Sequence, residues 1–362
     1  MNAATRLHEA GQSLWLDNIT RRLLDEGRLA RYIADDSVTG LTSNPTIFDR
    51  AIAGSGDYDD QIRRLAGRGL GEEGLFFELA LDDLRRAAGL LRPVWDATHG
   101  VDGWVSLEVS PRLARDTAGT VAEARRLHQR AGFPNLYIKV PGTHEGLPAI
   151  TELIYQGVPV NVTLLFSDDQ YLGAAGAYQR GLERRREAGL DLVVGSVASL
   201  FVSRWDHSTL DQLPDDLKDE LGIAVAKRAY RDYRGVLASP RWQDLAAAGA
   251  RPQRLLFAST GTKDPARPDT YYVESLAAPD TVNTMPQPTL DAFIDHGHVG
   301  DLLPEDARWA DEVVARVEAY GIDVADLAAR LQREGADAFV ASWNDLMGSI
   351  ESRTRAVAGA QR

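Results

Sequence analysis

The chain has 362 residues, and its 53 acidic side chains outnumber its 40 Lys and Arg side chains, for a formal net charge of −13 at pH 7. An acidic surface offers no counter-charge to nucleic acid or to an anionic membrane, so neither partner is expected. The chain has no cysteine, which excludes disulfides, thiolate metal sites and cysteine nucleophiles. A composition of 44% hydrophobic and 26% charged residues is typical of a soluble globular protein.

The basic residues are unevenly divided, with 36 arginines and only the four lysines Lys139, Lys218, Lys227 and Lys263. Only lysine can become a neutral amine nucleophile, so each one is of interest. No run approaches the roughly 20 apolar residues that span a bilayer, and Met1–Gln12 lacks the apolar core of a secretory signal. The expected compartment is therefore the cytoplasm.

Short β-branched runs alternate with longer amphipathic stretches along most of the chain, a pattern typical of a parallel sheet or barrel. Eight such runs are present, which is the number that closes a (β/α)₈ barrel. The predicted strands are Leu14–Asn18, Thr39–Asn44, Trp104–Ser110, Asn135–Pro141, Pro159–Phe166, Leu192–Ser199, Arg254–Thr260 and Thr281–Met285.

Helical stretches lie between these strands and lengthen the chain at three places. We expect one α/β domain over residues 1–362, a (β/α)₈ TIM barrel with extra helices after strands 2 and 6 and a helical C-terminus, because no Pro/Gly/Ser-rich linker divides the chain. The predicted helices include Pro45–Leu65 and Glu72–Leu91 after strand 2, Arg112–Ala131 after strand 3, Leu210–Leu245 after strand 6, and most of the chain from Pro304 to about Val357.

Three consecutive strands share a pattern in which two polar residues alternate with aliphatic ones. Since strand side chains alternate between faces, the aliphatic face of each strand is expected to meet the helices and the polar pair to point into the barrel. Active sites of such barrels lie at the carboxyl ends of the strands. The polar pairs are Ser106 and Glu108, Tyr137 and Lys139, and Asn161 and Thr163.

Lys139 is the strongest candidate for chemistry. A lysine at a strand end can also reach solvent or pair with a carboxylate, but Lys139 lies among Tyr137, Ile138, Val140 and Pro141, where a lysine without a function is costly. Removal from water disfavours the ammonium form of a lysine, and the free amine can attack a carbonyl. The pattern therefore predicts Schiff-base chemistry on a ketone or aldehyde.

Imine chemistry also needs groups that carry protons. Glu108 on the adjacent strand can serve, through a water positioned with Thr163. Asp17 offers a second carboxylate at the end of the first strand, and spacing alone leaves it equally consistent with the N-cap of the next helix.

The segment Thr42–Thr46 ends a strand and opens a helix, with Pro45 near its first position. Simple helix capping is a strong interpretation of Ser43. Asn44 and Asn161 could instead donate hydrogen bonds to the hydroxyls of a polyol.

Taken together, these residues resemble the transaldolase family, the Schiff-base aldolase-type barrels of the pentose phosphate pathway, and the late stretches resemble its longer bacterial subgroup. The likeness runs in family order from Leu14 to Pro265, and the late stretches ASTGTKDP and TVNTMP are the ones that resemble the longer bacterial subgroup. The matching stretches are LWLDNI (14–19), GLTSNPTIF (40–48), VSLEVS (105–110), YIKVPGTHEG (137–146), NVTLLFS (161–167), ASLFVSRWD (198–206), ASTGTKDP (258–265) and TVNTMP (281–286).

The resemblance implies reversible transfer of a dihydroxyacetone unit from sedoheptulose 7-phosphate or fructose 6-phosphate to glyceraldehyde 3-phosphate or erythrose 4-phosphate, without metal or organic cofactor. It implies that Lys139 forms the imine, that Asp17 moves the proton of the C4 hydroxyl, and that Glu108 and Thr163 hold the water of imine formation. The implied substrate contacts are Asn44 and Asn161 with the dihydroxyacetone hydroxyls, and Ser199.

The phosphate subsite of the family matches in part. Arg204 corresponds to its phosphate-binding arginine, whose guanidinium suits a phosphate. Many relatives also have a serine and a second arginine on the seventh strand. Here Ser259 keeps the serine, no arginine is present, and Lys263 is either a replacement cation or a loop lysine in solvent.

Two alternatives to transfer remain at this point, a fructose-6-phosphate aldolase and a sugar-phosphate-binding barrel without turnover. Phe201, where the related aldolases usually have tyrosine, and Glu108, where they tend to have glutamine, favour transfer. The sequence Asp295–His298 suggests a metal pair but is interpreted as a loop after a short helix. The expected partners are small sugar phosphates, and the protein is expected to be a monomer or homodimer.

Overall fold

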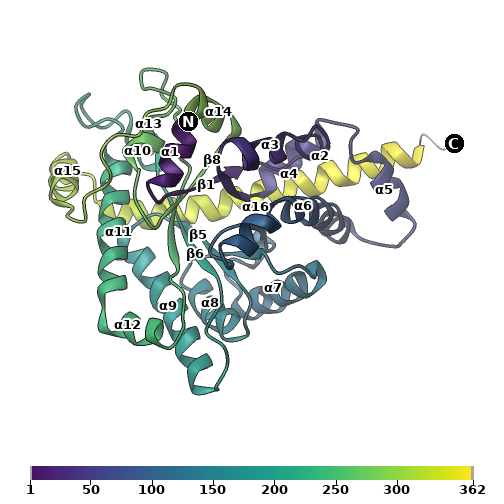
Figure 1. The fold of residues 1–362 in the computed structure, drawn as a ribbon. Helices are drawn as coiled ribbons and strands as arrows, with labels where there is room; N and C mark the ends of the chain where they lie inside the picture. The colour runs from purple at the N-terminus through teal and green to yellow at the C-terminus, as the bar shows by residue number, and fades with distance from the viewer. Residues whose placement is uncertain (1, 360–362) are drawn as a thin grey trace.

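The computed structural model describes residues 2–359 and contains a closed barrel of eight parallel strands in the order β1 to β8 (Figure 1). Each strand pairs in parallel with its neighbours in the chain, and β8 closes the ring on β1. The predicted (β/α)₈ barrel is confirmed. The strands are β1 Ser13–Asp17, β2 Val38–Thr42, β3 Trp104–Glu108, β4 Leu136–Pro141, β5 Val160–Leu165, β6 Ser196–Phe201, β7 Arg254–Ala258 and β8 Val282–Met285.

Most predicted strand ends differ from the observed ones by one or two residues, and the largest displacement is at the start of the sixth strand. The prediction began at Leu192, whereas β6 begins at Ser196, because pairing with β5 starts opposite Val160. Leu192 and Val194 are buried and apolar, so their burial resembles that of a strand although they are not part of the ladder. Phe201, placed after the predicted strand, is the last residue of β6.

The helices surround the barrel, and several predicted ones are subdivided. They are α1 Ala3–Glu9, α2 Arg21–Asp25, α3 Arg28–Asp35, α4 Pro45–Ala53, α5 Asp59–Ala66, α6 Glu72–Ala97, α7 Thr117–Ala131, α8 Gly146–Tyr155, α9 Asp168–Glu187, α10 Ser203–Thr209, α11 Leu221–Ala238, α12 Pro240–Ala247, α13 Tyr271–Ser275, α14 Gln287–His296, α15 Arg308–Ala319 and α16 Val324–Gly359, with a 3₁₀ turn at Pro111–Leu113.

The subdivisions follow local turn chemistry. The predicted helix Pro45–Leu65 is interrupted at Gly54-Ser55-Gly56, where glycine lowers helix propensity. The predicted helix from Arg112 instead starts at Thr117, because the Asp116 side chain accepts the N–H of Gly119 and caps α7. Ser239 and Pro240 divide the insert after β6 in the same way, with Ser239 capping α12. The N-terminal helix α1 was not predicted.

Aromatic rings fill the half of the barrel interior that lies toward the amino ends of the strands. Tyr137, predicted to point inward, stacks on Trp104 with ring centroids 4.0 Å apart and on Trp15 with centroids 6.0 Å apart. Gly40 on β2 faces this stack, and a Cβ at that position would lie 2.5 Å from the Trp15 indole. These rings leave the opposite, carboxyl end of the barrel for the polar residues.

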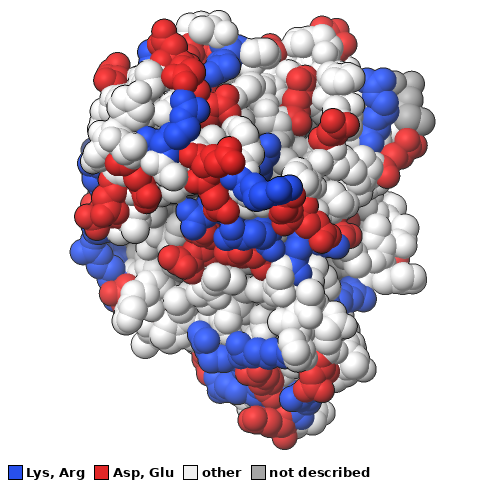
Figure 2. Space-filling model, turned by 90° about the vertical axis from the view of Figure 1, so that its left-hand side faces the viewer, with Lys and Arg blue, Asp and Glu red and all other residues white. Residues whose placement is uncertain are grey.

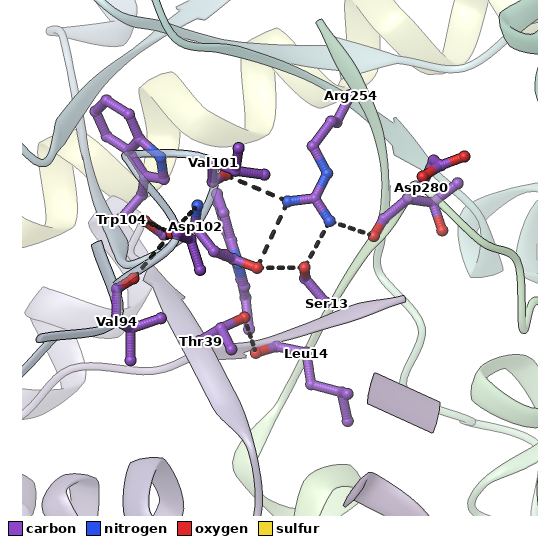
Figure 3. Close-up of polar contacts among 12 residues, drawn as sticks. Ser13, Leu14, Thr39, Val94, Val101, Asp102, Trp104, Arg254 and Asp280 are labelled. Carbon is purple, nitrogen blue, oxygen red and sulfur yellow. Dashed lines mark hydrogen bonds and ion pairs between the residues drawn. The ribbon is translucent and has the colours of Figure 1, made fainter. Parts of the chain in front are cut away.

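At the amino end of the strands, the interior closes on a buried ion pair between Arg254 of β7 and Asp102 (Figure 3). Arg254 also donates to the Ser13 hydroxyl at 2.5 Å and to the Thr281 carbonyl at 2.7 Å. Asp102 accepts from the Trp15 indole N–H at 2.8 Å and from Ser13. Charge is therefore buried here only together with its partners, as a stable core requires.

The long C-terminal helix α16 crosses the molecule and covers part of the barrel mouth (Figure 1). Gln332 of α16 donates to the carbonyls of Gly142 and Leu164 at 3.1 and 2.9 Å. Leu164 lies at φ +60° where the β5–β6 register shifts, so its carbonyl is available to a partner outside the ladder. This contact fixes α16 at the carboxyl ends of β4 and β5.

The outer face formed by α11 and α15 has interspersed acidic and basic side chains (Figure 2). Arg228 pairs with Asp168 at 2.9 Å, and Arg234 pairs with Asp280 at 2.8 Å. Pairs that remain partly in contact with water contribute little stability each. None of the helices in residues 2–359 has the length and apolar character that crossing a bilayer would require.

Candidate active site

A cavity of about 480 Å³ opens at the carboxyl ends of the strands, the end predicted for the active site. It is lined by residues at or near the ends of seven strands, all but β3, and by residues of α4, α14 and α16. All but two of the eleven predicted site residues line it, namely Asp17, Asn44, Lys139, Thr163, Ser199, Phe201, Arg204, Ser259 and Lys263. The other two, Glu108 and Asn161, are buried in the barrel interior.

Lys139 of β4 lies at the cavity with only 5% of its surface exposed. Its Nζ donates to the Ser43 carbonyl at 3.0 Å and lies 3.8 Å from Glu108 Oε2. The second distance is an ion-pair separation and is too long for a hydrogen bond. A lysine and a carboxylate from adjacent strands are therefore brought together at the same depth, with Glu108 and Lys139 directly paired in the β3–β4 register.

The Glu108 carboxyl is perturbed by its surroundings. Burial raises its pKa to about 7, although the positive charge of Lys139 opposes the rise. Both of its oxygens lack a hydrogen-bond partner among the described residues. A buried carboxyl that can exchange a proton near neutral pH is suited to general acid–base work.

Asp17 at the end of β1 is the second carboxylate of the site. The hydroxyl of Thr42 donates to its Oδ1 at 2.7 Å, and burial raises its pKa while the positive charge of Lys139 opposes the rise. Asp17 is not a helix cap, because Thr20 caps α2 by accepting the N–H of Leu23. The helix-cap interpretation of Asp17 is therefore wrong, and its carboxylate instead faces the cavity.

Thr163 and Asn161 both point inward from β5 but lie in different environments. The Thr163 hydroxyl lines the cavity and has no hydrogen-bond partner among residues 2–359. The Asn161 amide is enclosed, since its oxygen accepts from Ser199 Oγ at 2.7 Å and its nitrogen donates to Ser106 Oγ at 3.2 Å. Thr163 is therefore available to a ligand, whereas Asn161 is buried beneath the cavity and orients Ser199 through a hydrogen bond.

The end of β2 differs from the prediction in which residue caps the helix. Asn44 is the N-cap of α4, and its side-chain oxygen accepts the N–H of Ile47 at 3.0 Å. The interpretation of Ser43 as the cap is wrong, because its hydroxyl donates to the Ser106 carbonyl at 2.8 Å. Capping occupies the oxygen of Asn44 and leaves its amide N–H groups facing the cavity.

Arg204, Lys263 and Phe201 lie together on one wall. The Arg204 guanidinium lies 5.2 Å from the Phe201 ring centroid and 5.9 Å from that of Phe339, and burial lowers its pKa. Burial, together with the nearby positive charge of Arg204, also lowers the pKa of Lys263. Two adjacent cations without a carboxylate between them form an environment suited to a phosphate.

Ser259 follows β7 in an unusual backbone conformation, with φ +57°. Non-glycine residues in this region cost energy and occur often at functional sites. The Ser259 and Ser203 hydroxyls share a hydrogen bond of 2.9 Å, which fixes both side chains beside the cavity.

Among the cavity residues that the sequence did not single out, three have polar or aromatic side chains with a clear place in the site: Thr42, Arg50 and Phe339. Thr42 holds Asp17, and its position directly before the Ser-Asn-Pro turn was the available signal. Arg50 lies in the second turn of α4, and Phe339 comes from α16, far along the chain from Lys263, the last predicted site residue. Nothing in local sequence pattern indicates that these two residues reach the same cavity.

No group of three or more His, Asp or Glu side chains within the described ranges is arranged to hold a metal ion. His296 is the last residue of α14 rather than part of a loop. Its ring nitrogens lie 2.9 Å from Asp269 and 3.2 Å from Asp295 on the surface.

Comparison with known proteins agrees with this geometry. The family model "Transaldolase/Fructose-6-phosphate aldolase" matches residues 14–350. A transaldolase of Thermobifida fusca (strain YX) is 48% identical over 97% of this chain and 98% of its own length. Transaldolases of Acidothermus cellulolyticus and Streptomyces avermitilis are 48% and 45% identical, over 98% and 99% of this chain and 97% and 98% of their own lengths. The chain belongs to the transaldolase/fructose-6-phosphate aldolase family.

Proposed function

We propose that this protein is a transaldolase, an enzyme that moves a dihydroxyacetone unit reversibly from sedoheptulose 7-phosphate to glyceraldehyde 3-phosphate. The products are erythrose 4-phosphate and fructose 6-phosphate, as in the non-oxidative pentose phosphate pathway. One observation carries the proposal: Lys139 and Asp17 line one cavity, and the buried Glu108 carboxylate lies 3.8 Å from Lys139 Nζ, so that residues of three strands come together. The transaldolase names of the relatives support it.

The reaction begins when the neutral amine of Lys139 attacks the C2 carbonyl of the donor. The resulting carbinolamine must lose its hydroxyl as water, which requires a proton. Glu108, with a pKa near 7 and a position 3.8 Å from Nζ, can deliver that proton and take it back during hydrolysis. In this mechanism the Thr163 hydroxyl, which has no partner among the described residues, holds the departing or attacking water.

Cleavage follows from the positive charge on the imine. Asp17 removes the proton of the C4 hydroxyl, the C3–C4 bond breaks, and its electron pair is delocalised toward the imine nitrogen as an enamine. The aldehyde product leaves. When the acceptor aldehyde binds, the enamine carbon attacks its carbonyl and Asp17 returns the proton to the new hydroxyl. Burial raises the pKa of Asp17, which makes the carboxylate a stronger base for this step.

The family also contains fructose-6-phosphate aldolases, in which the enamine is protonated and free dihydroxyacetone is released. Phe201 favours transfer, because the phenyl ring that lines the cavity has no proton to give to the enamine. A barrel that binds sugar phosphates without turnover is the less favoured alternative, since the lysine and both carboxylates are present.

Borohydride reduction tests the covalent step. In the presence of fructose 6-phosphate, reduction should label Lys139 in the wild type, and the label should be absent in Lys139→Met. Lys218→Met is the matched control, because Lys218 is an exposed lysine paired with Asp215, and this variant should be labelled as well as the wild type. Label on another residue, or none, contradicts the proposal.

Steady-state assays separate the three functions. A transaldolase forms sedoheptulose 7-phosphate from fructose 6-phosphate and erythrose 4-phosphate. Release of dihydroxyacetone without an acceptor, at a rate similar to transfer, would instead show an aldolase. Binding of fructose 6-phosphate without either product would show a barrel that lacks turnover.

A further inference from the structure

Thr284 is a residue of the barrel interior that the reaction described above does not use. It lies on β8, lines the cavity and is only 4% exposed. The strand β1, which ends at Asp17, pairs with β2 on one side and with β8 on the other. Thr42 at the end of β2 and Thr284 on β8 reach toward each other, and their hydroxyl oxygens are 2.7 Å apart. The two strands that flank Asp17 are therefore joined by a contact between side chains.

A chain of two hydrogen bonds leads from Thr284 to Asp17. Thr42 Oγ1 lies 2.7 Å from Asp17 Oδ1 as well as 2.7 Å from Thr284 Oγ1. A threonine hydroxyl has one proton to donate, and an ionised carboxylate can only accept. Since the proton of Thr42 is used on Asp17, Thr284 must donate to Thr42. A hydroxyl that accepts a hydrogen bond is polarised and becomes a stronger donor, so Thr284 strengthens the bond from Thr42 to Asp17.

The Thr284 hydroxyl serves no other part of the described structure. Thr42 is its only hydrogen-bond partner within residues 2–359. Valine has nearly the same shape and also favours strands, so β8 itself does not need a hydroxyl at this position. The backbone of Thr284 is held separately, because its carbonyl accepts from the Thr260 hydroxyl at 3.2 Å. The contact with Thr42 therefore accounts for the hydroxyl.

Asp17 depends on an anchor of this kind because a carboxylate can turn easily. The torsion that rotates a carboxyl group has broad minima. In this site Oδ1 of Asp17 accepts from Thr42, whereas Oδ2 makes no hydrogen bond with any residue in the described part of the chain. Fixing Oδ1 also fixes the direction of Oδ2, which is the oxygen left to remove a proton from a substrate hydroxyl.

We propose that Thr284 is a positioning residue, which acts through Thr42 to hold the Asp17 carboxylate in the orientation that proton transfer at the C4 hydroxyl requires. This inference rests on the proposed function, because it takes Asp17 as the base of that reaction. It adds a residue that works through a hydrogen-bond chain across three adjacent strands, β8, β1 and β2.

A double-mutant cycle tests whether Thr284 acts through Thr42. In transfer from fructose 6-phosphate to erythrose 4-phosphate, Thr42→Val should lower kcat by about tenfold or more, because it removes a bond to a charged group, and Thr284→Val should lower it by about 3–10-fold. The double variant should match Thr42→Val within about twofold, because the chain is already broken. Losses that multiply would show that Thr284 acts independently of Thr42 and would overturn the inference.

The pH dependence of kcat distinguishes this role from a purely structural one. The bond from Thr42 favours the ionised form of Asp17 and lowers its pKa, so Thr284→Val should shift the acid limb of the kcat profile to higher pH. Lys139 on β4 and Glu108 on β3 are the charged groups that interact with Asp17, and both remain in this variant. An acid limb that does not move contradicts the positioning role.

Two control variants separate the hydroxyl from the fold. Thr284→Ser keeps the hydroxyl and should retain most of the wild-type kcat and the same pH profile. Thr39→Val removes a buried hydroxyl from β2 outside the cavity, where it donates to the Leu14 carbonyl at 3.5 Å, and should leave both properties unchanged. If Thr284→Ser loses as much activity as Thr284→Val, the hydroxyl is not the cause and the inference is wrong.

A measurement without turnover keeps this inference separate from the proposed function. In a ¹³C NMR titration of the aspartate carboxyls, with Asp17→Asn to identify the signal, Asp17 should titrate at higher pH in Thr284→Val than in wild type. This shift in a protein that catalyses no transfer would contradict the proposed function and still support the hydrogen-bond chain. An unchanged titration of Asp17 would refute the chain whether or not the protein is active.

Discussion

The substitution Glu108→Gln should stabilise the protein while it removes activity, and the gain should depend on pH in a defined direction. Glutamine has nearly the shape of a protonated glutamic acid and cannot ionise. Glu108 is 4% exposed, and both of its oxygens lack hydrogen-bond partners within the described chain. The ionised form is therefore the disfavoured one, and replacement by glutamine removes the cost of ionisation.

The magnitude follows from the shift of the Glu108 pKa from 4.5 to about 7. A carboxyl with a raised pKa in the folded state retains a proton that the unfolded chain has already lost. Its contribution to the free energy of unfolding therefore falls as pH rises from about 4.5 to about 7, and is constant above that range. At 1.36 kcal/mol per unit, Glu108→Gln should gain about 3 kcal/mol above pH 8 and about 1 kcal/mol at pH 5.

Urea unfolding of the wild type and Glu108→Gln at several pH values between 5 and 8.5 measures this difference. Glu183→Gln serves as a control of opposite sign, because the Arg241 guanidinium beside Glu183 lowers the pKa of that carboxyl. Its substitution should destabilise the protein slightly at neutral pH. A gain in Glu108→Gln that is the same at pH 5 and pH 8.5, or that is larger at pH 5, would refute the electrostatic argument.

Three further substitutions test other parts of the structure. Arg204→Gln should lower kcat/KM for fructose 6-phosphate by about 10–100-fold and leave unphosphorylated fructose unaffected; equal losses for both sugars would contradict a phosphate contact. Gly40→Ala should destabilise by about 1–3 kcal/mol, because its Cβ would lie 2.5 Å from Trp15; urea unfolding measures this, and an unchanged midpoint would show that the ring can move. Arg254→Met should destabilise by about 3–5 kcal/mol in the same assay, because it leaves Asp102 buried without its cation, and a neutral result would show that Ser13 and Trp15 alone satisfy Asp102.

Much of the fold could be predicted because a parallel barrel leaves a regular sequence pattern. The paired residues of β3, β4 and β5 alternate with aliphatic ones, and the structure places Glu108, Lys139 and Thr163 on the inner face as expected. The prediction failed for β6, where Leu192 and Val194 are as apolar as strand residues but precede the ladder. Burial alone does not determine where hydrogen bonding between strands begins.

At the site, the predictions from sequence were wrong or incomplete for a different physical reason. Capping was assigned to the wrong residue because Ser43 and Asn44 are both good caps, and only the position of the Ser106 carbonyl decides between them. Arg50 and Phe339 could not be found, because helices α4 and α16 bring them to the cavity through tertiary packing. Site residues at strand ends can be predicted from the local sequence pattern. Site residues on helices cannot, because their place at the cavity depends on how the helices pack in the fold.

The opposite signs expected for Glu108→Gln and Arg254→Met show how the two ends of the barrel differ. At the amino end, Arg254 and Asp102 are buried with every partner in place, so removal of either leaves an uncompensated charge. At the carboxyl end, Glu108 and Thr163 are buried with polar atoms left unpartnered, and each such atom costs about 1–3 kcal/mol. The stacked rings of Trp15, Trp104 and Tyr137 at the amino end offset part of that cost by burying apolar surface. The groups that destabilise the fold are those that a bound sugar and its water can satisfy.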